Sequence, residues 1–588
     1  MSLHDRTVLR GIPASHGVVV GKACLVGRSA LRVPRRRIAS SAAPGEVARF
    51  RKAIQASRAE IEGARAALGD GAAADYRLIL DAHLLMHGDA LLVDATVEVI
   101  EREHICAEWA LRRTVESLAR QLEEASSEYF RGRAADVTQV GLHILRCLTG
   151  APTVLPDVDE PMIVVADDLS PAEAARLSKR PIIGLVTELG SPTSHTAIIA
   201  RALGVPALVG VSDATDRVAD GDTVVVDAIR GELVLSADAA ERAVAAERSS
   251  SYRAFTARLR SRAGGEVGTR DGELVTLSAN LEMATEVEAA AGPEASGVGL
   301  FRTEFLYLGR DQAPTEAEQC AVYAEVLEAM SPRTVTFRTF DLGADKLPRS
   351  RRFVAGPNPA LGLRGVRLLL THPRLFRTQV RAILRAAENG NARLMFPLVG
   401  SVGDMRHARS LVDEVLAELE AAGAAHGEVP IGAMIEVPAA AMMADALAKE
   451  CDFFSVGTND LVQYTLALDR TNPRVAPLAR PLDPAVLKLL DLTARAAREN
   501  GTDLSMCGDM AADAFALPIV IGLGYRHLSM PTAAIPMAHA IVERIDTRAA
   551  ASVAKAALEL PDVESVHELV RESFGETLGD LWEAQGLG

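Results

Sequence analysis

The sequence predicts a multidomain α/β protein: an α/β domain interrupted by an inserted α-helical bundle, followed by a C-terminal (β/α)8 barrel. Three observations predict it. The chain has 588 residues, which is too long for a single hydrophobic core. A long stretch with helical spacing, nearly free of Gly and Pro after Gly88, separates two sets of strand-like segments. Beyond residue 266, strand-like segments alternate with helical patterns almost to the end.

Strand-like segments with short loops lie toward both ends of the first 236 residues. They cover 8–12, 17–21, 162–166, 182–186 and 224–227. Between them the apolar side chains recur at helical spacing, which indicates a bundle. The economical interpretation is one α/β domain formed by 1–40 and 150–236, with a helical bundle of 41–149 inserted into it.

The rest of the chain is interpreted as a connecting helix and a barrel. Residues 237–266 are rich in Ala, Arg and Glu and lack Gly and Pro until Gly264, so we expect a linker helix. Eight strand-like segments within 267–588 match a (β/α)8 barrel of the TIM type in number and size. They lie at 274–277, 298–300, 335–337, 394–396, 431–435, 453–456, 504–506 and 527–530.

Composition excludes several classes of protein. The formal net charge of −15 disfavours nucleic acid as a partner and favours a basic or neutral protein; the one arginine cluster, 35–37, is interpreted as solvated surface. None of the six cysteines lies in a close pair, so zinc-ribbon and thioredoxin-type sites are not expected. Scattered cysteines, an N-terminus without a signal core and the lack of a membrane-spanning apolar run predict a cytoplasmic protein with no membrane insertion.

The segment 190–201, GSPTSHTAIIAR, reads as a loop that leads into a helix. Thr193 or Ser194 would cap the helix and place His195 in its first turn. A helix N-terminus offers free N–H groups and favours both a bound anion and a neutral imidazole, as a phosphoryl-accepting nucleophile requires. A single histidine in such a place is more often a surface or core residue, so the rest of the chain must decide.

Polar residues also follow the predicted barrel strands, at the ends where (β/α)8 barrels carry their chemistry. They are Arg302, Arg338, Glu436, Asn459, Asp460, Cys507 and, ten residues beyond Asp460, Arg470. Converging arginines indicate a small polyanion, facing carboxylates indicate a shared Mg²⁺, and a thiol can serve as acid or nucleophile. Taken singly, each arginine could pair with an acid, each carboxylate could cap a helix, and Cys507 could be inert core.

Four blocks in order carry a resemblance over nearly the whole length, from about Gly11 to beyond Met530. They are Gly-x-x-x-Ser-His-Thr-x-Ile-x-Ala-Arg at 190–201, GVGLFRTEF at 297–305, FFSVGTNDL at 453–461 with its continuation to Arg470, and Met-Cys-Gly at 506–508. The chain thereby resembles enzyme I of the phosphoenolpyruvate-dependent sugar phosphotransferase system. The resemblance implies a swivelling phosphohistidine domain, a helical domain that docks a carrier protein, and a phosphoenolpyruvate-binding barrel that also forms the homodimer.

The resemblance also implies a role for each motif residue. His195 would take the phosphoryl group of phosphoenolpyruvate on Nε2, and Cys507 would protonate the enolate carbon to release pyruvate. Glu436 and Asp460 would bind Mg²⁺. The substrate would be held by Arg302, Arg338, Asn459, Asp460 and Arg470, with Arg364 as a weaker candidate. The 237–266 helix would serve as the hinge region.

The phosphoryl group would then pass to a histidine of a small HPr-like carrier, as the first step of sugar phosphotransferase transport. The chain departs from the family around its docking segment, with Ala72-Ala73-Ala74-Asp75 before His83 and Leu91-Leu92 after it. A divergent HPr or a nitrogen-system carrier is therefore an open alternative, although no sensory domain precedes residue 1. A pyruvate-phosphate dikinase-like enzyme would need a nucleotide-binding loop that we do not find, and a regulatory binding protein would lack one of the key residues.

Overall fold

The computed structural model forms two compact units, residues 1–255 and 256–588. It describes residues 7–26, 34–67, 84, 86–87, 89–123, 128–149, 160–167, 169, 180–190, 196, 200, 204–307, 312–341, 359–470 and 475–587.

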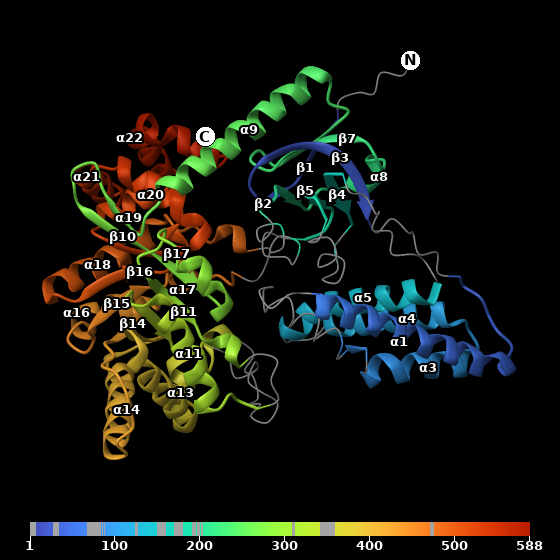
Figure 1. Ribbon diagram of the computed structural model, residues 1–588, viewed down its shortest axis with the longest axis horizontal. Coiled ribbons are helices and arrows are strands. Elements are labelled where there is room, and N and C mark those ends of the chain that lie inside the picture. The colour runs from blue at the N-terminus through green and yellow to red at the C-terminus, as the bar shows by residue number, and fades with distance from the viewer. Residues whose placement is uncertain are drawn as a thin grey trace. The chain divides into compact units, whose positions relative to one another are not determined.

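The first unit contains a mixed eight-stranded sheet with the strand order β1-β8-β7-β3-β4-β5-β6-β2. Figure 1 labels β1 to β5 and β7 of this sheet. Its central strands β3, β4, β5 and β6 run parallel, and the apolar residues of β4, β5 and β6 are almost all buried. The strands are β1 Thr7–Arg10, β2 Ile12–Ser15, β3 Val18–Val26, β4 Met162–Ala166, β5 Ile182–Thr187, β6 Ala207–Val209, β7 Thr223–Asp227 and β8 Glu232–Leu235.

Four longer helices of this unit come from the predicted helical segment: α1 Ala43–Ala67, α3 Ala90–Glu103, α4 Ala107–Glu123 and α5 Glu128–Thr149. Their apolar faces share one core that includes Phe50, Ile100 and Ile144. Asp89 caps α3 by accepting a hydrogen bond from the backbone N–H of Leu91. A short helix, α8 Ala214–Arg217, follows β6.

The helix α9, Ala239–Arg262, lies within the range expected for the linker helix. The boundary between the two units falls inside it, after Phe255. Its first half is joined to the first unit by an ion pair of 2.6 Å between Arg248 and Asp227. Its last turn is joined to the second unit by an ion pair of 2.7 Å between Arg262 and Glu543.

The second unit is a closed barrel of eight parallel strands, which confirms the predicted fold class (Figure 1). Closure is direct, because β10 pairs in parallel with both β11 and β17. All eight predicted strands are present, and β9 Glu266–Gly268 adds an antiparallel partner to β10. The barrel strands are β10 Leu274–Leu281, β11 Val298–Arg302, β12 Val335–Arg338, β13 Ala392–Phe396, β14 Ile431–Ile435, β15 Phe453–Val456, β16 Asp503–Met506 and β17 His527–Pro531.

Helices surround the strands, and residues at the helix ends supply the capping hydrogen bonds. Thr315 and Glu318, for example, form a reciprocal capping box at the start of α11. None of the described helices of the chain has the length and apolarity needed to cross a membrane. The helices are α10 Val287–Ala290, α11 Glu316–Met330, α12 Gly365–Thr371, α13 Pro373–Ala386, α14 Val402–Ala421, α15 Pro438–Met442, α16 Ala444–Leu447, α17 Thr458–Thr465, α18 Pro484–Asn500, α19 Ala516–Gly522, α20 Ile535–Arg544, α21 Thr547–Ala557 and α22 Val563–Ala584.

Candidate active site

The mouth of the barrel brings together the polar residues that the sequence places at strand ends. Arg302 and Arg338 are the last residues of β11 and β12 and are paired in register. Glu436 directly follows β14, and Cys507 directly follows β16. Because all eight strands run parallel, these side chains share one end of the barrel.

Asp341 joins two of the arginines. Arg364 donates to both of its carboxylate oxygens, from Nε at 3.0 Å and from Nη2 at 2.6 Å. Arg338 Nη1 lies 3.5 Å from the same carboxylate, and Arg338 Nη2 donates to Glu304 at 3.0 Å. Glu304 also accepts the backbone N–H of Asp341 at 2.6 Å. The two arginines are therefore held in fixed orientation by buried acids.

Asp460 forms the opposite side of this network, in the first turn of α17. Its carboxylate lies 3.3 Å from Arg364 Nη2 and 3.2 Å from Arg470 Nη2. Tyr464, one turn further along α17, accepts a hydrogen bond from Arg364 Nη1 at 3.3 Å and donates one to the carbonyl of Ala360. Arg364 is thus the most fully bonded arginine of the mouth.

Three carboxylates, Asp341, Glu436 and Asp460, have oxygens within 4.8 Å of one another. Burial and the neighbouring charges of Asp460 and Asp341 raise the pKa of Glu436 above its ordinary range. Burial also disfavours the charged form of Asp341, but Arg338 and Arg364 outweigh it and lower its pKa. Concentrated carboxylates that are partly neutralised by arginine form a suitable place for a hard cation.

Several buried polar atoms of the mouth have no hydrogen-bond partner among the described residues. They are Glu304 Oε2, Arg302 Nε and Arg338 Nε. Asp460 Oδ1 also lacks a hydrogen bond of good geometry, but it forms the 3.2 Å ion pair with Arg470. Buried polar groups are nearly always satisfied in a folded protein, so atoms of both signs left unpaired in one mouth indicate a ligand. A ligand that carries negative groups together with a cation would match both kinds of atom.

Asn459 is oriented by the loop that follows β16. Its Oδ1 accepts the backbone N–H of Asp509 at 2.8 Å, which leaves the amide nitrogen to donate elsewhere. Gly508 makes this close packing possible, because a Cβ at that position would lie 1.9 Å from Thr458 Oγ1. The backbone after Cys507 is therefore pressed against the start of α17.

The thiol of Cys507 lies in an apolar cluster with Leu300, Met395 and Met434. Its Sγ is 3.7 Å from the carbonyl oxygen of Val456. Burial raises the pKa of Cys507 to about 11, although the side chain of Ser455 and the nearby guanidinium groups of Arg338 and Arg302 oppose the shift. The group is consequently a neutral thiol at ordinary pH, which suits a proton donor rather than a thiolate nucleophile.

Arg302 does not share the Asp341 network. Its Nη1 donates to Glu282 Oε1 at 2.5 Å, and Glu282 stands one residue beyond the end of β10. The backbone N–H of Glu282 is in turn held by Glu286 at 2.8 Å. Glu282 is therefore hydrogen-bonded to the guanidinium group of Arg302, which the sequence predicts as a substrate ligand.

His195 and its expected caps, Thr193 and Ser194, lie outside the described residues, as does His83 of the docking segment. Thr196 is described and buried, and its hydroxyl has no hydrogen-bond partner within the described part of the chain. The role of His195 stays a prediction.

Sequence reasoning missed the acids that hold the arginines. Asp341, Glu304 and Glu282 each stand within three residues of a strand end or its arginine, and that proximity was the available signal. The sequence alone, however, does not distinguish an acid that pairs with a buried arginine from an acid on the surface. The difference emerges only when the strands close into a barrel. Arg364, the weaker candidate from the sequence, precedes the helix α12 instead of ending a strand, and its part in substrate binding stays a prediction.

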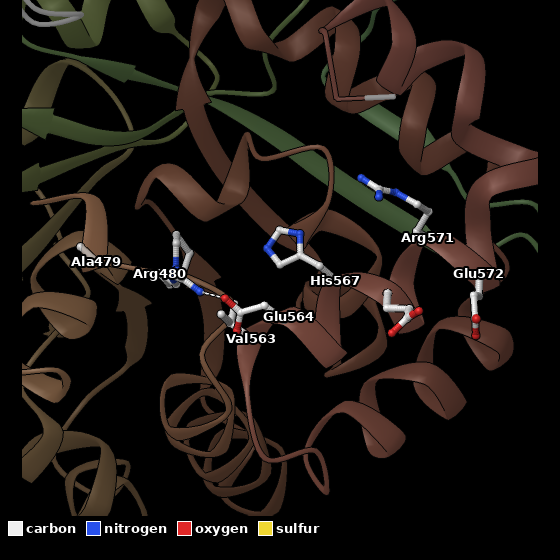
Figure 2. Close-up of a pocket in the computed structure, with 9 residues that line it drawn as sticks. Ala479, Arg480, Val563, Glu564, His567, Arg571 and Glu572 are labelled. Carbon is white, nitrogen blue, oxygen red and sulfur yellow. Dashed lines mark hydrogen bonds and ion pairs between the residues drawn. The ribbon is translucent and has the colours of Figure 1, made fainter.

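A separate hollow lies between residues 479–481 and the first half of α22 (Figure 2). Both of its arginines have partners, since Arg480 pairs with Glu564 and Arg571 lies over the ring of Phe515. The hollow contains none of the arginines or carboxylates of the barrel mouth. We therefore locate the candidate active site at the mouth.

Three family models match the chain. The model described as PEP-utilising enzyme, PEP-binding domain, covers residues 258–547. The N-terminal model of the PEP-utilising enzymes covers residues 10–133, and the mobile-domain model covers residues 158–231.

Full-length relatives match as well. A phosphoenolpyruvate-protein phosphotransferase of Bacillus subtilis is 38% identical over 568 residues, which are 96% of this chain and 99% of the relative. One of Listeria innocua is 37% identical over 570 residues, 97% of this chain and 99% of the relative. A solution NMR structure of Enzyme I covers 42% of this chain and 99% of its own, with 32% identity and a TM-score of 0.37.

Proposed function

The chain belongs to the phosphoenolpyruvate-protein phosphotransferase family of PEP-utilising enzymes, and we propose that it transfers the phosphoryl group of phosphoenolpyruvate to His195 and then to a carrier protein. The observation that carries the proposal is the mouth of the barrel. Arg338 and Arg364 converge there on Asp341, beside the carboxylates of Glu436 and Asp460.

The arginines of the mouth would bind the substrate. Phosphoenolpyruvate carries a phosphate and a carboxylate, and guanidinium groups bind both through paired hydrogen bonds. Arg302, Arg338 and Arg470 would make these contacts, with the amide nitrogen of Asn459 as a further donor. Arg364 is tied to Asp341, Asp460 and Tyr464, so its positive charge would act mainly by keeping these groups in place.

Mg²⁺ fits the donor set of the mouth. Glu436 and Asp460 would hold it through hard carboxylate oxygens, which lie together with those of Asp341 within 4.8 Å of one another. The cation would supply neutralisation of the phosphate charge during transfer.

Cys507 would complete the release of pyruvate. As the phosphoryl group leaves, the P–O bond to the enol oxygen breaks, a P–N bond forms at His195 Nε2, and electron density collects at C3 of the enolate. The thiol then gives its proton to C3, and the resulting thiolate regains a proton from water. The raised pKa of the thiol keeps that proton available at neutral pH.

His195 belongs to the unit 1–255, whereas the mouth belongs to the unit 256–588. The reaction therefore requires that the first unit present the histidine to the mouth and later to the carrier, and α9, which spans the boundary, is the proposed hinge region. The chain would thus comprise a phosphohistidine domain of residues 1–40 and 150–236, the linker helix 237–266 and the barrel 267–588. The helical segment 41–149 would be the docking domain for an HPr-like carrier.

Two further proposals concern assembly and location. Leu361, Leu363, Met442 and Met443 are exposed apolar side chains near the mouth, where both α15 and the 359–361 turn adjoin α17. Such a patch supports a homodimer formed through the barrel. All six cysteines are unpaired thiols, which supports the reducing environment of the cytoplasm.

The test of transfer is incubation with phosphoenolpyruvate and Mg²⁺ in the absence of nucleotide. We expect stoichiometric pyruvate and acid-labile phosphate on the protein, and neither in His195→Ala. Label that persists in His195→Ala would reject the assignment of the acceptor.

The test of the metal site uses thermal unfolding with and without Mg²⁺. A cation that binds only the folded protein raises the Tm in proportion to RT ln(1 + [Mg²⁺]/Kd). The Tm of the parent protein should rise, and that of Glu436→Gln should rise less. Equal shifts in both proteins would contradict the assignment.

A further inference from the structure

We infer that Asn280 is a positioning residue for the reaction: its side-chain amide anchors the backbone carbonyl of Cys507 and so aims the thiol that protonates the enolate. The inference rests on the proposed role of Cys507. Asn280 Nδ2 donates to the carbonyl oxygen of Cys507 at 3.0 Å.

The hydrogen bond from Asn280 is needed because the backbone pairing between β16 and β17 ends before Cys507. β16 pairs with β17 at Ser505 and Met506, and that pairing ends there. On its other side Cys507 donates its N–H to Val456 of β15 at 3.0 Å. The carbonyl of Cys507 is bound by a side chain from β10, the strand beyond β17 in the barrel.

The amide of Asn280 is itself held in one orientation. The carbonyl oxygen of Cys507 can only accept a hydrogen bond, so the amide nitrogen must face it. Ser529 Oγ lies 2.6 Å from Asn280 Oδ1 and 3.1 Å from the carbonyl oxygen of Ala279, so it can donate to the amide oxygen. Ser529 is buried on β17, and Gly299 leaves it the necessary room, since a Cβ there would lie 2.4 Å from its hydroxyl oxygen. Both polar ends of the amide are thus used within the protein.

The backbone of β10 is irregular where Asn280 begins. The register with β11 shifts between Ala279 and Asn280, so that Ala279 faces Val298 and Asn280 faces Leu300. Irregularities of this kind at barrel rims redirect a side chain. The shift comes at the residue that reaches Cys507.

On the far side of the peptide, Gly508 is pressed against Thr458. The peptide between Cys507 and Gly508 is therefore clamped from β10 on one side and from α17 on the other. Because the direction of the Cα–Cβ bond follows from the peptide plane, the clamp determines where the thiol points within the cluster of Leu300, Met395 and Met434.

The experiment is single-turnover pyruvate formation from phosphoenolpyruvate and Mg²⁺ by the full-length protein. Asn280→Ala should slow this step by about tenfold, the effect of losing one well-placed hydrogen bond, with the half-saturating concentration of phosphoenolpyruvate changed less than about twofold. Asn280→Asp keeps the size of the side chain but faces the carbonyl with a carboxylate oxygen, so it should be slow as well. Ser529→Ala should act in the same direction.

Asn391→Ala is the matched control, because Asn391 also donates its amide to a backbone carbonyl, that of Pro332, next to the N-terminal end of β13. It should leave the single-turnover rate unchanged. Cys507→Ala distinguishes the positioning role of Asn280 from the proton-donor role of Cys507. If Cys507→Ala is slow while Asn280→Ala and Asn280→Asp react at the parental rate, the positioning role is wrong; if Cys507→Ala itself reacts normally, the proposed proton donor is wrong.

Discussion

Arg364 and Asp341 face each other through two hydrogen bonds, from Nε to Oδ1 at 3.0 Å and from Nη2 to Oδ2 at 2.6 Å. The pair links the loop after β12 to the start of α12, and it lies beside both Arg338 and Asp460. A bidentate arginine–carboxylate pair is rigid, so it orders the mouth before a substrate arrives. Arg364 therefore helps to build the site, whereas Arg302 and Arg470 each pair with a single acid among the described residues, through one ion pair.

Asp341→Asn should therefore impair both stability and catalysis. The variant removes the negative charge that Arg338 and Arg364 share, so that within the described part of the chain Arg338 keeps only Glu304 and Arg364 keeps only Asp460 as an acidic partner. Breaking a buried pair in this way costs about 3 kcal/mol of unfolding free energy. Their loss of orientation should lower kcat/KM for phosphoenolpyruvate at least about tenfold. Chemical denaturation and steady-state pyruvate release measure the two effects.

The control is Glu418→Gln, because Glu418 also accepts from two arginines, Arg377 and Arg381, but on the exposed surface. Exposed pairs contribute little, so both quantities should stay near the parental values. Equal losses in the two variants would show that Asp341 has no special part in the site.

Glu282→Gln should lower the concentration of phosphoenolpyruvate needed for half-saturation by about threefold or more. In the free protein Glu282 neutralises Arg302, and an incoming anion must displace it. A neutral amide competes less strongly for the guanidinium. Initial-rate measurements across phosphoenolpyruvate concentrations give the answer, with the exposed Glu288→Gln on α10 as the control. A raised half-saturation value would mean that Glu282 orients Arg302 and does not compete for it.

Alkylation of Cys507 by iodoacetamide should accelerate with pH without levelling off between pH 7 and 9. Burial raises the thiol pKa to about 11, so the reactive thiolate fraction grows about tenfold per pH unit throughout this range. The free energy of unfolding should also depend on pH. The neutral thiol favours the folded state below the ordinary pKa of 9.0, and this contribution to stability is lost as pH rises from there toward 11. Peptide mass spectrometry distinguishes Cys507 from the other cysteines, and a plateau near pH 8 would contradict the shift.

Gly508→Ala should destabilise the barrel and reduce pyruvate formation, because the new Cβ would lie 1.9 Å from Thr458 Oγ1 and 2.4 Å from the Thr458 backbone nitrogen. The backbone must move, and Cys507 and Asn459 move with it. Gly579→Ala in α22 is the control: open space surrounds the added methyl group, and alanine favours a helix by up to about 1 kcal/mol. Thermal unfolding should show opposite signs for the two variants.

Local pattern was enough to predict the strands and much of the mouth. Each barrel strand is recognised as a short, mainly apolar run. Parallel strands bring the polar residues that follow such runs to one end of the barrel, as they do for Arg302, Arg338, Glu436 and Cys507. The partners of these residues were harder to predict. Arg364 meets Asp460 across 96 positions, and Asn280 meets Cys507 across 227.

The sequence by itself determined the order of elements, the chemical types at the strand ends and the family to which the chain is similar, because these depend on short segments read one at a time. The tertiary structure decided which arginines pair with acids, how burial and two neighbouring acids raise the pKa of Glu436, and which amide holds Cys507. Those properties depend on distance and burial, and both arise only when the strands close into a barrel.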